Sequence, residues 1–279
     1  IDLIKNRMKS GNTLFCCGLD PDINKLPIEI TEKNWSDEKK VLSFMKTVVD
    51  ITVDHVCAFK AQKAFFDLLP CGHNILKELI AYIHGKYNEI PVIVDCKIGD
   101  IGNTMEAYNK NLFNFLDADG VVINPYMGDD VFQSLKDYPE KAIVVLVKTS
   151  NLGGGIVQNA LTVDWRPVWQ YILKLVVDRW NEFHNLIPVL SSTEDIETYN
   201  IRSQIPDEML VLLAGAGAQG GNLSCLSKFL NKEKGGVIVN SSRQVLYPVV
   251  GVNETWQSAI KREAIKFKEM LNNERGKYE

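Results

Sequence analysis

Three charged residues follow a run of apolar residues in the stretch VIVDCKIGDIGNT, which spans positions 92–104. The first three residues of this stretch, Val92, Ile93 and Val94, are apolar and β-branched, and such runs are typical of strands buried inside a parallel sheet. Asp95, Lys97 and Asp100 then follow within six positions. Because removing an unpaired charge from water is costly, this strand end is either a solvated structural ion pair or an active site.

Alternation along the strand predicts how these side chains are oriented. Successive side chains of a strand point to opposite faces, so Asp95 and Lys97 should point the same way while Cys96 faces the surrounding helices. Lys60 and Gln62 have the same two-residue spacing in the earlier run HVCAFKAQ. A carboxylate between ammonium groups stays ionised and keeps the lysines protonated. An ion-pair network that merely closes the end of a sheet is the structural alternative.

Hydrophobic periodicity identifies the elements that must position these residues. Eight short apolar runs occur along the chain, each followed by a longer segment with apolar residues at three-to-four spacing. The runs cover residues 13–20, 55–62, 91–98, 120–127, 142–150, 187–193, 210–218 and 236–243. Eight alternating strand and helix pairs predict a closed (β/α)8 TIM barrel, formed as a single domain over residues 1–279. An open doubly wound sheet is the nearest competitor.

Polar residues gather where the predicted strands end, which in a barrel of this kind is the face that carries the active site. These residues are Asp20, Lys60, Gln62, Asp95, Lys97, Lys148 and Arg243. Asp100 lies just beyond its strand, in a loop that Gly99 and Gly102 allow to turn tightly. Asn103 or Thr104 could simply cap the following helix, but a cap does not explain Asp100.

A glycine-rich stretch, LLAGAGAQGGNLS, follows the seventh run. Gly215, Gly217 and Gly220 match the dinucleotide fingerprint G-x-G-x-x-G, but the match occurs late in the chain and the next strand ends in Arg243 rather than an acid. A barrel phosphate site explains both facts, because loops after the last two strands supply backbone N–H groups and Arg243 supplies a forked donor. A glycine-rich turn without a ligand is the alternative.

Composition excludes several classes of protein. The net charge of −4 comes from 31 basic and 35 acidic residues without a Lys/Arg-rich tract, so nucleic acid is not an expected partner. Apolar runs such as AIVVLV are too short to span a bilayer, and the N-terminal segment lacks the apolar core of a signal peptide. Six cysteines without CxxC spacing favour reduced thiols in the cytoplasm, and four scattered histidines predict no metal site.

Together these motifs resemble the orotidine 5'-monophosphate decarboxylase family. The resemblance rests on GLDPD, FKAQKAFF, DCKIGDIGNT, VKTSN, AGAGAQGG and Arg243. The residues of these motifs are most similar to those of the family branch that includes apicomplexan parasite enzymes. It implies decarboxylation of orotidine 5'-monophosphate to UMP and CO2, the last step of de novo pyrimidine biosynthesis, without a cofactor. It also implies a cytoplasmic homodimer with shared active sites. Fusion with orotate phosphoribosyltransferase occurs in some eukaryotic members.

The resemblance also implies roles for individual residues. The catalytic array would consist of Lys60, Asp95, Lys97 and Asp100. The substrate-binding residues would be Asp20, Gln62, Ile101, Thr104, Ser150, Gln219 and Arg243. Of these residues, Asp20 and Gln62, together with Lys60 of the catalytic array, would lie at the ribose. Ser150 would bind the pyrimidine, and Gln219 and Arg243 would hold the phosphate. Asp100 and Thr104 would reach across a dimer interface into the site of the partner.

Two positions depart from the family pattern. Ile98 follows Lys97 where many bacterial members have arginine, and Ala214 stands where proline is common in the pyrimidine pocket. Neither change removes a catalytic group, although Ala214 affects the shape of the pocket.

Three other functions stay open from the residues alone: a Schiff-base aldolase using Lys60 or Lys148, an NAD-dependent oxidoreductase and a non-catalytic nucleotide-binding barrel.

Overall fold

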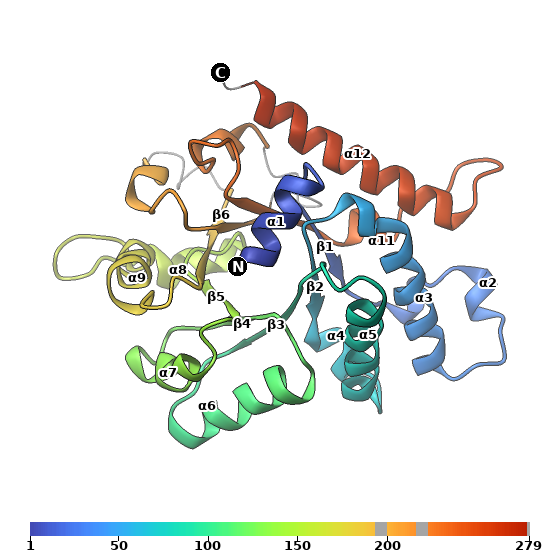
Figure 1. Ribbon diagram of the computed structural model, residues 1–279, viewed down its shortest axis with the longest axis horizontal. Coiled ribbons are helices and arrows are strands. Elements are labelled where there is room, and N and C mark those ends of the chain that lie inside the picture. The colour runs from blue at the N-terminus through green and yellow to red at the C-terminus, as the bar shows by residue number, and fades with distance from the viewer. Residues whose placement is uncertain (193–199, 216–222, 278–279) are drawn as a thin grey trace.

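A closed barrel of eight parallel strands forms the centre of the computed structural model, which describes residues 1–192, 200–215 and 223–277 (Figure 1). Each strand pairs with the next in the sequence, and β8 pairs with β1 to close the ring. The strands are β1 (Phe15–Leu19), β2 (Ala58–Gln62), β3 (Val92–Ile98), β4 (Gly120–Ile123), β5 (Ala142–Leu146), β6 (Leu186–Ser191), β7 (Val211–Ala214) and β8 (Val237–Ser241). The predicted (β/α)8 barrel is therefore confirmed, and the alternative prediction of an open doubly wound sheet is wrong.

Helices surround the barrel and cover the outward faces of its strands (Figure 1). The longer ones are α1 (Asp2–Ser10), α3 (Asp37–Thr52), α5 (Gly72–Lys86), α6 (Gly102–Asn109), α9 (Val168–Leu175) and α12 (Trp256–Gly276). The shorter ones are α2 (Ile28–Thr31), α4 (Lys63–Asp67), α7 (Asp129–Gln133), α8 (Gly155–Gln158) and α11 (Arg243–Leu246). In the described residues no helix is both long and apolar enough to cross a bilayer.

The segments expected to be regular helices are less uniform than the periodicity suggested. The α-helices α6 and α9 end early and continue as π-helices, over Lys110–Phe115 and Val176–Trp180. Between β7 and β8, the only helix in the described residues is a 3-10 helix, Leu223–Lys228. Hydrophobic periodicity indicates which face of a segment is buried, but it does not distinguish a 3-10 helix or a π-helix from an α-helix.

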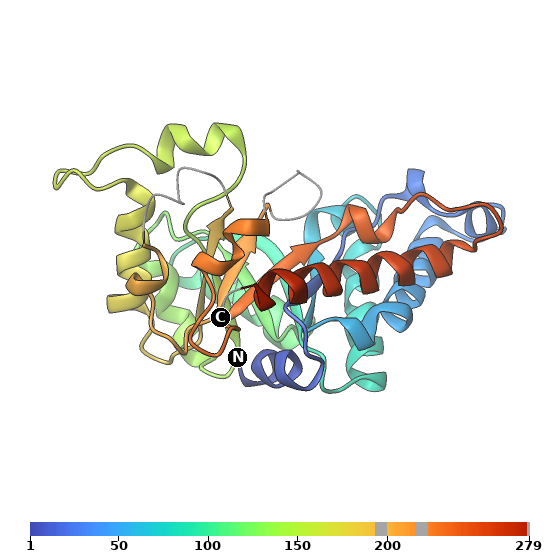
Figure 2. The ribbon, with the colours of Figure 1, turned by 90° about the horizontal axis from the view of Figure 1, so that it is seen from above.

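The inside and outside of the barrel wall are both apolar, which explains why the strands read as continuous hydrophobic runs. Val92, Ile93 and Val94 of β3 are fully buried, as are the valines at the centre of β5. The N-terminal end of the barrel is covered by α1, which lies in front of the strands in Figure 1 and contributes buried Ile4. The opposite end is therefore the open face. In Figure 2 this face points upward, and the segment containing α8 projects from it.

Electrostatic contacts also fasten helix α5 to the N-terminal side of the barrel. His84, in the last turn of α5, lies 2.9 Å (Nε2) from Asp119 Oδ2 and 3.3 Å (Nδ1) from Asp117 Oδ2. The same oxygen of Asp119 accepts a hydrogen bond from the backbone N–H of Val92 at 2.8 Å, at the start of β3. The hydrogen bond to Asp119 raises the pKa of His84 above its ordinary value of 6.5. Protonated His84 therefore stabilises the packing of α5 on β3 and β4.

Replacing His84 with glutamine should destabilise the fold in a pH-dependent way. Because the pKa of His84 is raised in the folded state, its contribution is fully present below pH 6.5 and is lost as pH rises through the folded value. The His84→Gln variant should lose about 1 kcal/mol of unfolding free energy at pH 6, and much less at pH 9. Urea unfolding of both proteins at the two pH values measures this. An equal loss at pH 6 and pH 9 would contradict a charged role for His84.

Candidate active site

A buried ion-pair cluster lies at the open end of β2 and β3. Asp95 accepts hydrogen bonds from Lys60 Nζ at 3.0 Å, from Lys97 Nζ at 2.7 Å and from Gln62 Nε2 at 3.2 Å. The parallel register places Gln62 directly beside Asp95, so the two strand ends present these groups at the same level. The structure thus brings together four residues that were predicted from strand-end positions.

Burial and charge oppose each other at this cluster. The side chains of Lys60 and Asp95 are only 9% and 8% exposed, whereas that of Lys97 is 47% exposed. Burial alone would raise the pKa of Asp95, but Lys60 and Lys97 lower it below its ordinary value. Burial likewise opposes the charge on Lys60, but Asp95 and Asp20 raise the pKa of Lys60 above its ordinary value. The carboxylate is therefore ionised between two cations, and Lys97 is the cation that a molecule in the barrel mouth can reach.

Lys97 owes its position to a break in the strand. The register between β3 and β4 shifts between Asp95 and Ile98, and Lys97 has a φ of +48°. A left-handed backbone is unfavourable for a lysine, and such strain persists only where surrounding contacts hold it. Asp95 and Lys97 meet as predicted, but regular strand alternation is not the reason. Cys96 is half-buried and faces a hollow lined by residues of α4 and α6, as the alternation had suggested.

Asp20 lies beside the cluster at the end of β1. Its Oδ1 atom is buried and accepts no hydrogen bond from the described residues. Burial raises the pKa of Asp20, while Lys60 and a hydrogen bond from Ser242 act in the opposite direction. An unsatisfied buried carboxylate oxygen calls for an additional donor, and a hydroxyl of a bound molecule would supply one.

Asp100 does not join the cluster within its own chain. Among the described residues, no hydrogen bond or ion pair connects Asp100 with Lys60, Asp95 or Lys97, and its Oδ1 accepts instead from the backbone N–H of Ile101 at 2.8 Å. Ile101 and Thr104 are exposed on the same segment. Within its own chain, Asp100 is therefore not bonded to the other three members of the predicted array.

The loop that carries Asp100 is as tight as its glycines suggested. Gly102 has a φ of +51°, and a Cβ atom on Gly99 would lie 2.1 Å from the carbonyl oxygen of Asn124. This contact joins the loop after β3 to the loop after β4. Helix α6 begins at Gly102 without a side-chain cap, so the alternative in which Asn103 or Thr104 caps this helix is wrong.

Residues after β5 and β7 meet on another side of the barrel mouth. A Cβ atom on Gly215, which has a φ of +85°, would lie 2.8 Å from Cβ of Ser150. Ala214, the residue before Gly215, is partly buried. Lys148 is buried and donates to Asn159 Oδ1 at 2.5 Å. Ser150 is therefore placed against the start of the glycine-rich stretch.

The predicted phosphate site is only partly described. Arg243 is exposed at the first position of α11, directly after β8. Gln219 lies outside the described residues, as do Gly217 and Gly220 of the glycine-rich motif. The position of Arg243 agrees with a site formed after the last strand, and its guanidinium is accessible to an anion.

Ser242 is a site residue that the sequence reasoning missed. A Cβ atom on Gly18 would lie 1.9 Å from Ser242 Oγ, so β1 and the segment before Arg243 approach each other closely. Asn240 Nδ2 donates to the same hydroxyl at 3.3 Å. An isolated glycine within a strand often marks such an approach, and Gly18 was the signal that could have indicated it.

The arrangement suits the stabilisation of negative charge that develops on a bound molecule. Lys97 is partly exposed and held in place by Asp95, so it can donate a proton or face an anion without reorganisation. Asp95 places a fixed negative charge beside it, and Asp20 offers an acceptor for a hydroxyl group. Arg243 adds a cation at the rim. These groups fit an anionic, hydroxyl-bearing substrate.

Known proteins share both the sequence and the fold of this chain. The model of the orotidine 5'-phosphate decarboxylase / HUMPS family matches residues 13–247. An orotidine 5'-phosphate decarboxylase from Janthinobacterium sp. is 36% identical over 265 residues, which are 95% of this chain and 94% of the relative. Both the family match and this relative span the segments that contribute the ion-pair cluster, Asp20 and Arg243.

Two solved structures extend the comparison to eukaryotes. A Toxoplasma gondii protein provisionally assigned as an orotidine-monophosphate decarboxylase has a TM-score of 0.86 and 25% identity, covering 100% of this chain and 98% of its own. Leishmania donovani UMP synthase has a TM-score of 0.83 and 29% identity, with 98% of this chain aligned to 56% of that protein. The resemblance to apicomplexan enzymes is thereby confirmed, and the chain belongs to the orotidine 5'-phosphate decarboxylase / HUMPS family.

Proposed function

We propose that this chain converts orotidine 5'-monophosphate to UMP and CO2, the last step of de novo pyrimidine biosynthesis. The observation that carries the proposal is the Lys60–Asp95–Lys97 cluster at the open end of the barrel, in a member of the decarboxylase family. Loss of CO2 from C6 of the pyrimidine leaves a carbanion that the ring delocalises poorly. Fixed charge in a dry site can stabilise such an anion without a cofactor.

Each member of the cluster has a distinct role in this proposal. Lys97 faces the developing carbanion and then protonates C6, because its ammonium group is the accessible cation of the cluster. Asp95 orients Lys97 through the 2.7 Å hydrogen bond and lies beside the departing carboxylate. Lys60 keeps Asp95 ionised and, with Asp20 and Gln62, contacts the ribose. Because its pKa is raised, Lys60 is a poor nucleophile for the Schiff-base chemistry of an aldolase.

The remaining contacts hold the distant parts of the nucleotide. Ser150 binds the pyrimidine from the rim next to Gly215, and Arg243 binds the 5'-phosphate together with Gln219. Binding energy from the phosphate is far from the bond that breaks. Such energy can order the site around the reacting atoms and so increase the rate.

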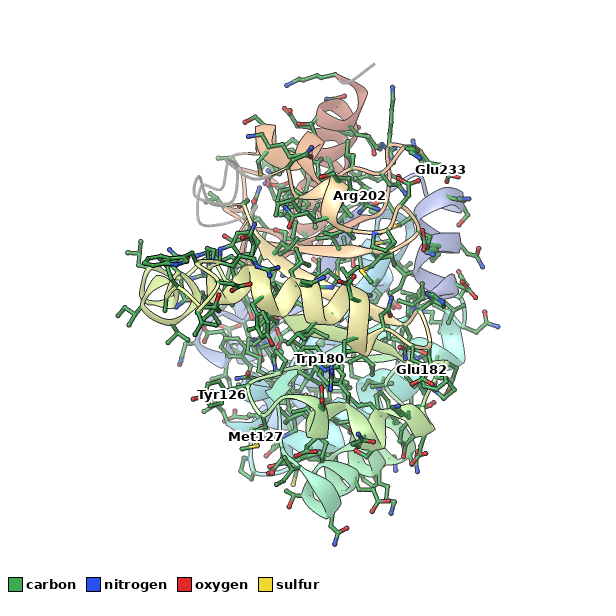
Figure 3. All side chains as sticks on the ribbon, turned by 90° about the vertical axis from the view of Figure 1, so that its left-hand side faces the viewer. Tyr126, Met127, Trp180, Glu182, Arg202 and Glu233 are labelled. Carbon is green, nitrogen blue, oxygen red and sulfur yellow. The ribbon has the colours of Figure 1, made fainter. Side chains whose placement is uncertain are left out.

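The active unit in this proposal is a homodimer with shared sites. Among the described residues, Asp100 makes no hydrogen bond or ion pair with the cluster of its own chain, and its segment carries exposed apolar residues. Ile101 and Tyr108 are 48% and 44% exposed, and Tyr126 and Met127 of the adjacent loop are 85% and 51% exposed. Figure 3 shows Tyr126 and Met127 on the side of the molecule away from Glu182 and Glu233. Apolar surface of this kind favours burial against a second copy.

In a two-fold dimer, the Asp100 loop would supply the neighbouring active site. Gly99 packs against Asn124, so the loops after β3 and β4 form one continuous surface. Thr104 and Tyr108 lie one helical turn apart on the outer face of α6, while Met105 faces inward. Asp100, Ile101 and Thr104 of each subunit would then contact the ribose bound to the other.

We further propose that the chain acts as a single domain, residues 1–279, in the cytoplasm. Cys16, Cys17, Cys57, Cys71 and Cys96 are free thiols, as expected for a reducing compartment. The similarity to a UMP synthase supports an association with orotate phosphoribosyltransferase, either as a fusion or as separate chains.

The activity can be tested by following the loss of orotidine 5'-monophosphate absorbance without added metal. The wild-type chain should consume the substrate, and Lys97→Ala should reduce kcat by at least about 100-fold because the proton donor is lost. UMP affinity should stay within about tenfold, since phosphate and ribose are held by other residues. Lys174→Ala, which removes an exposed lysine paired with Asp178, is the matched control and should leave turnover unchanged. Turnover by Lys97→Ala at the wild-type rate would refute the mechanism.

Mixing two inactive variants tests the shared site. Lys97→Ala and Asp100→Ala should each be nearly inactive alone. After refolding together in equal amounts, half of the dimers are mixed, and one of their two sites receives neither defect. About a quarter of all sites should therefore recover activity.

A second mixture provides the control for this experiment. Lys97→Ala and Asp95→Asn affect the same chain's cluster, so every site in their mixed dimers remains defective. This mixture should stay inactive. If the Lys97→Ala and Asp100→Ala mixture is equally inactive, Asp100 does not serve the site of the partner.

A further inference from the structure

Tyr247 connects two segments of the barrel rim that are 225 residues apart in the sequence. Its hydroxyl oxygen accepts a hydrogen bond from the backbone N–H of Asp22 at 2.6 Å and donates to the carbonyl oxygen of Asp20 at 3.1 Å. The hydroxyl group thus acts as both acceptor and donor, with one hydrogen bond on each side of Pro21. The turn after β1 is fixed from outside by a residue that follows α11.

The aromatic ring of Tyr247 is itself held in place. It stacks on Phe44 of α3, with ring centroids 5.8 Å apart and an interplanar angle of 13°. Lys25 Nζ lies 5.7 Å from the centroid of the ring. Burial raises the pKa of Tyr247, so the hydroxyl remains neutral and able to donate at physiological pH. The ring and the hydroxyl therefore form a rigid support rather than a flexible contact.

The two segments that Tyr247 connects carry groups at opposite ends of the proposed nucleotide. Asp20 provides the buried carboxylate whose Oδ1 has no partner among the described residues. On the other side, the backbone N–H of Tyr247 donates to the carbonyl oxygen of Arg243 at 3.1 Å, which places Tyr247 directly after the helical turn that begins with Arg243. A shift of Tyr247 would therefore change the spacing between Asp20 and Arg243.

We infer that Tyr247 is a positioning residue that holds Asp20 at the correct distance from Arg243, so that one nucleotide can engage both. Tyr247 itself lies behind the turn and acts through Asp20. This inference rests on the proposed function, in which Asp20 binds ribose and Arg243 binds phosphate. It adds a specific prediction: the hydroxyl of Tyr247 matters for nucleotide binding only while the Asp20 carboxylate is present.

The test uses Tyr247→Phe, which keeps the stacked ring and removes only the hydroxyl. Affinity for UMP, measured by calorimetry, should fall about tenfold, because the Asp20 turn loses both hydrogen bonds that fix it. In an Asp20→Ala background the same substitution should change the affinity less than twofold. Tyr82→Phe removes a tyrosine hydroxyl that bonds Asp50 on the outer surface, and as the matched control it should not change UMP affinity.

The outcomes separate this inference from the proposed function. An equal loss of UMP affinity in both backgrounds would show a general structural effect and overturn the inference, as would no loss in either. Wild-type UMP affinity in Asp20→Ala would also overturn it, because Tyr247 would have no ligand contact to position. If the wild-type chain binds UMP and shows the predicted dependence but does not decarboxylate orotidine 5'-monophosphate, the inference stands and the proposed function fails.

Discussion

The candidate site depends on keeping one buried carboxylate ionised. Asp95 is almost completely removed from water, and without cations beside it a carboxyl group in that position would bind a proton. Lys60 supplies a buried cation and Lys97 an accessible one, so the lysines are held by the same charge that they stabilise. Because the pKa of Asp95 is lowered, this interaction stabilises the fold at neutral pH, and the contribution is lost as pH falls through the folded value.

The barrel supplies the geometry that this cluster requires. Parallel pairing of β2 with β3 places Gln62 beside Asp95, and the shift in register before Ile98 turns Lys97 back toward the carboxylate. The strands keep Lys60 and Asp95 out of bulk water, while Lys97 stays accessible and is held to Asp95 by its hydrogen bond. The Lys60–Asp95–Lys97 cluster itself is ordered before a substrate arrives, which is the condition for electrostatic catalysis.

The sequence predicts the barrel and most of the cluster because both depend on local patterns. Apolar runs alternating with amphipathic segments predict the strands, and polar residues at the ends of these strands predict the open face. The left-handed backbone of Lys97 was not predictable, because it follows from a break in pairing rather than from residue preference. Tyr247 was missed for another reason: its contacts with Asp20 and Asp22 link distant segments, and no local spacing reports them.

The ionisation state of Asp95 tests the central claim most directly. Carbon-13 NMR of the chain labelled at aspartate carboxyl groups can follow this residue during an acid titration, with its signal identified by its absence in Asp95→Asn. The two lysines should keep Asp95 ionised below its ordinary pKa of 3.8. As the pH is lowered, the carboxyl signal of Asp95 should therefore stay that of the ionised form down to pH 3.8, or until the protein unfolds if that occurs first. A titration midpoint above 3.8 in the folded protein would contradict the account, because burial would then outweigh the paired charges.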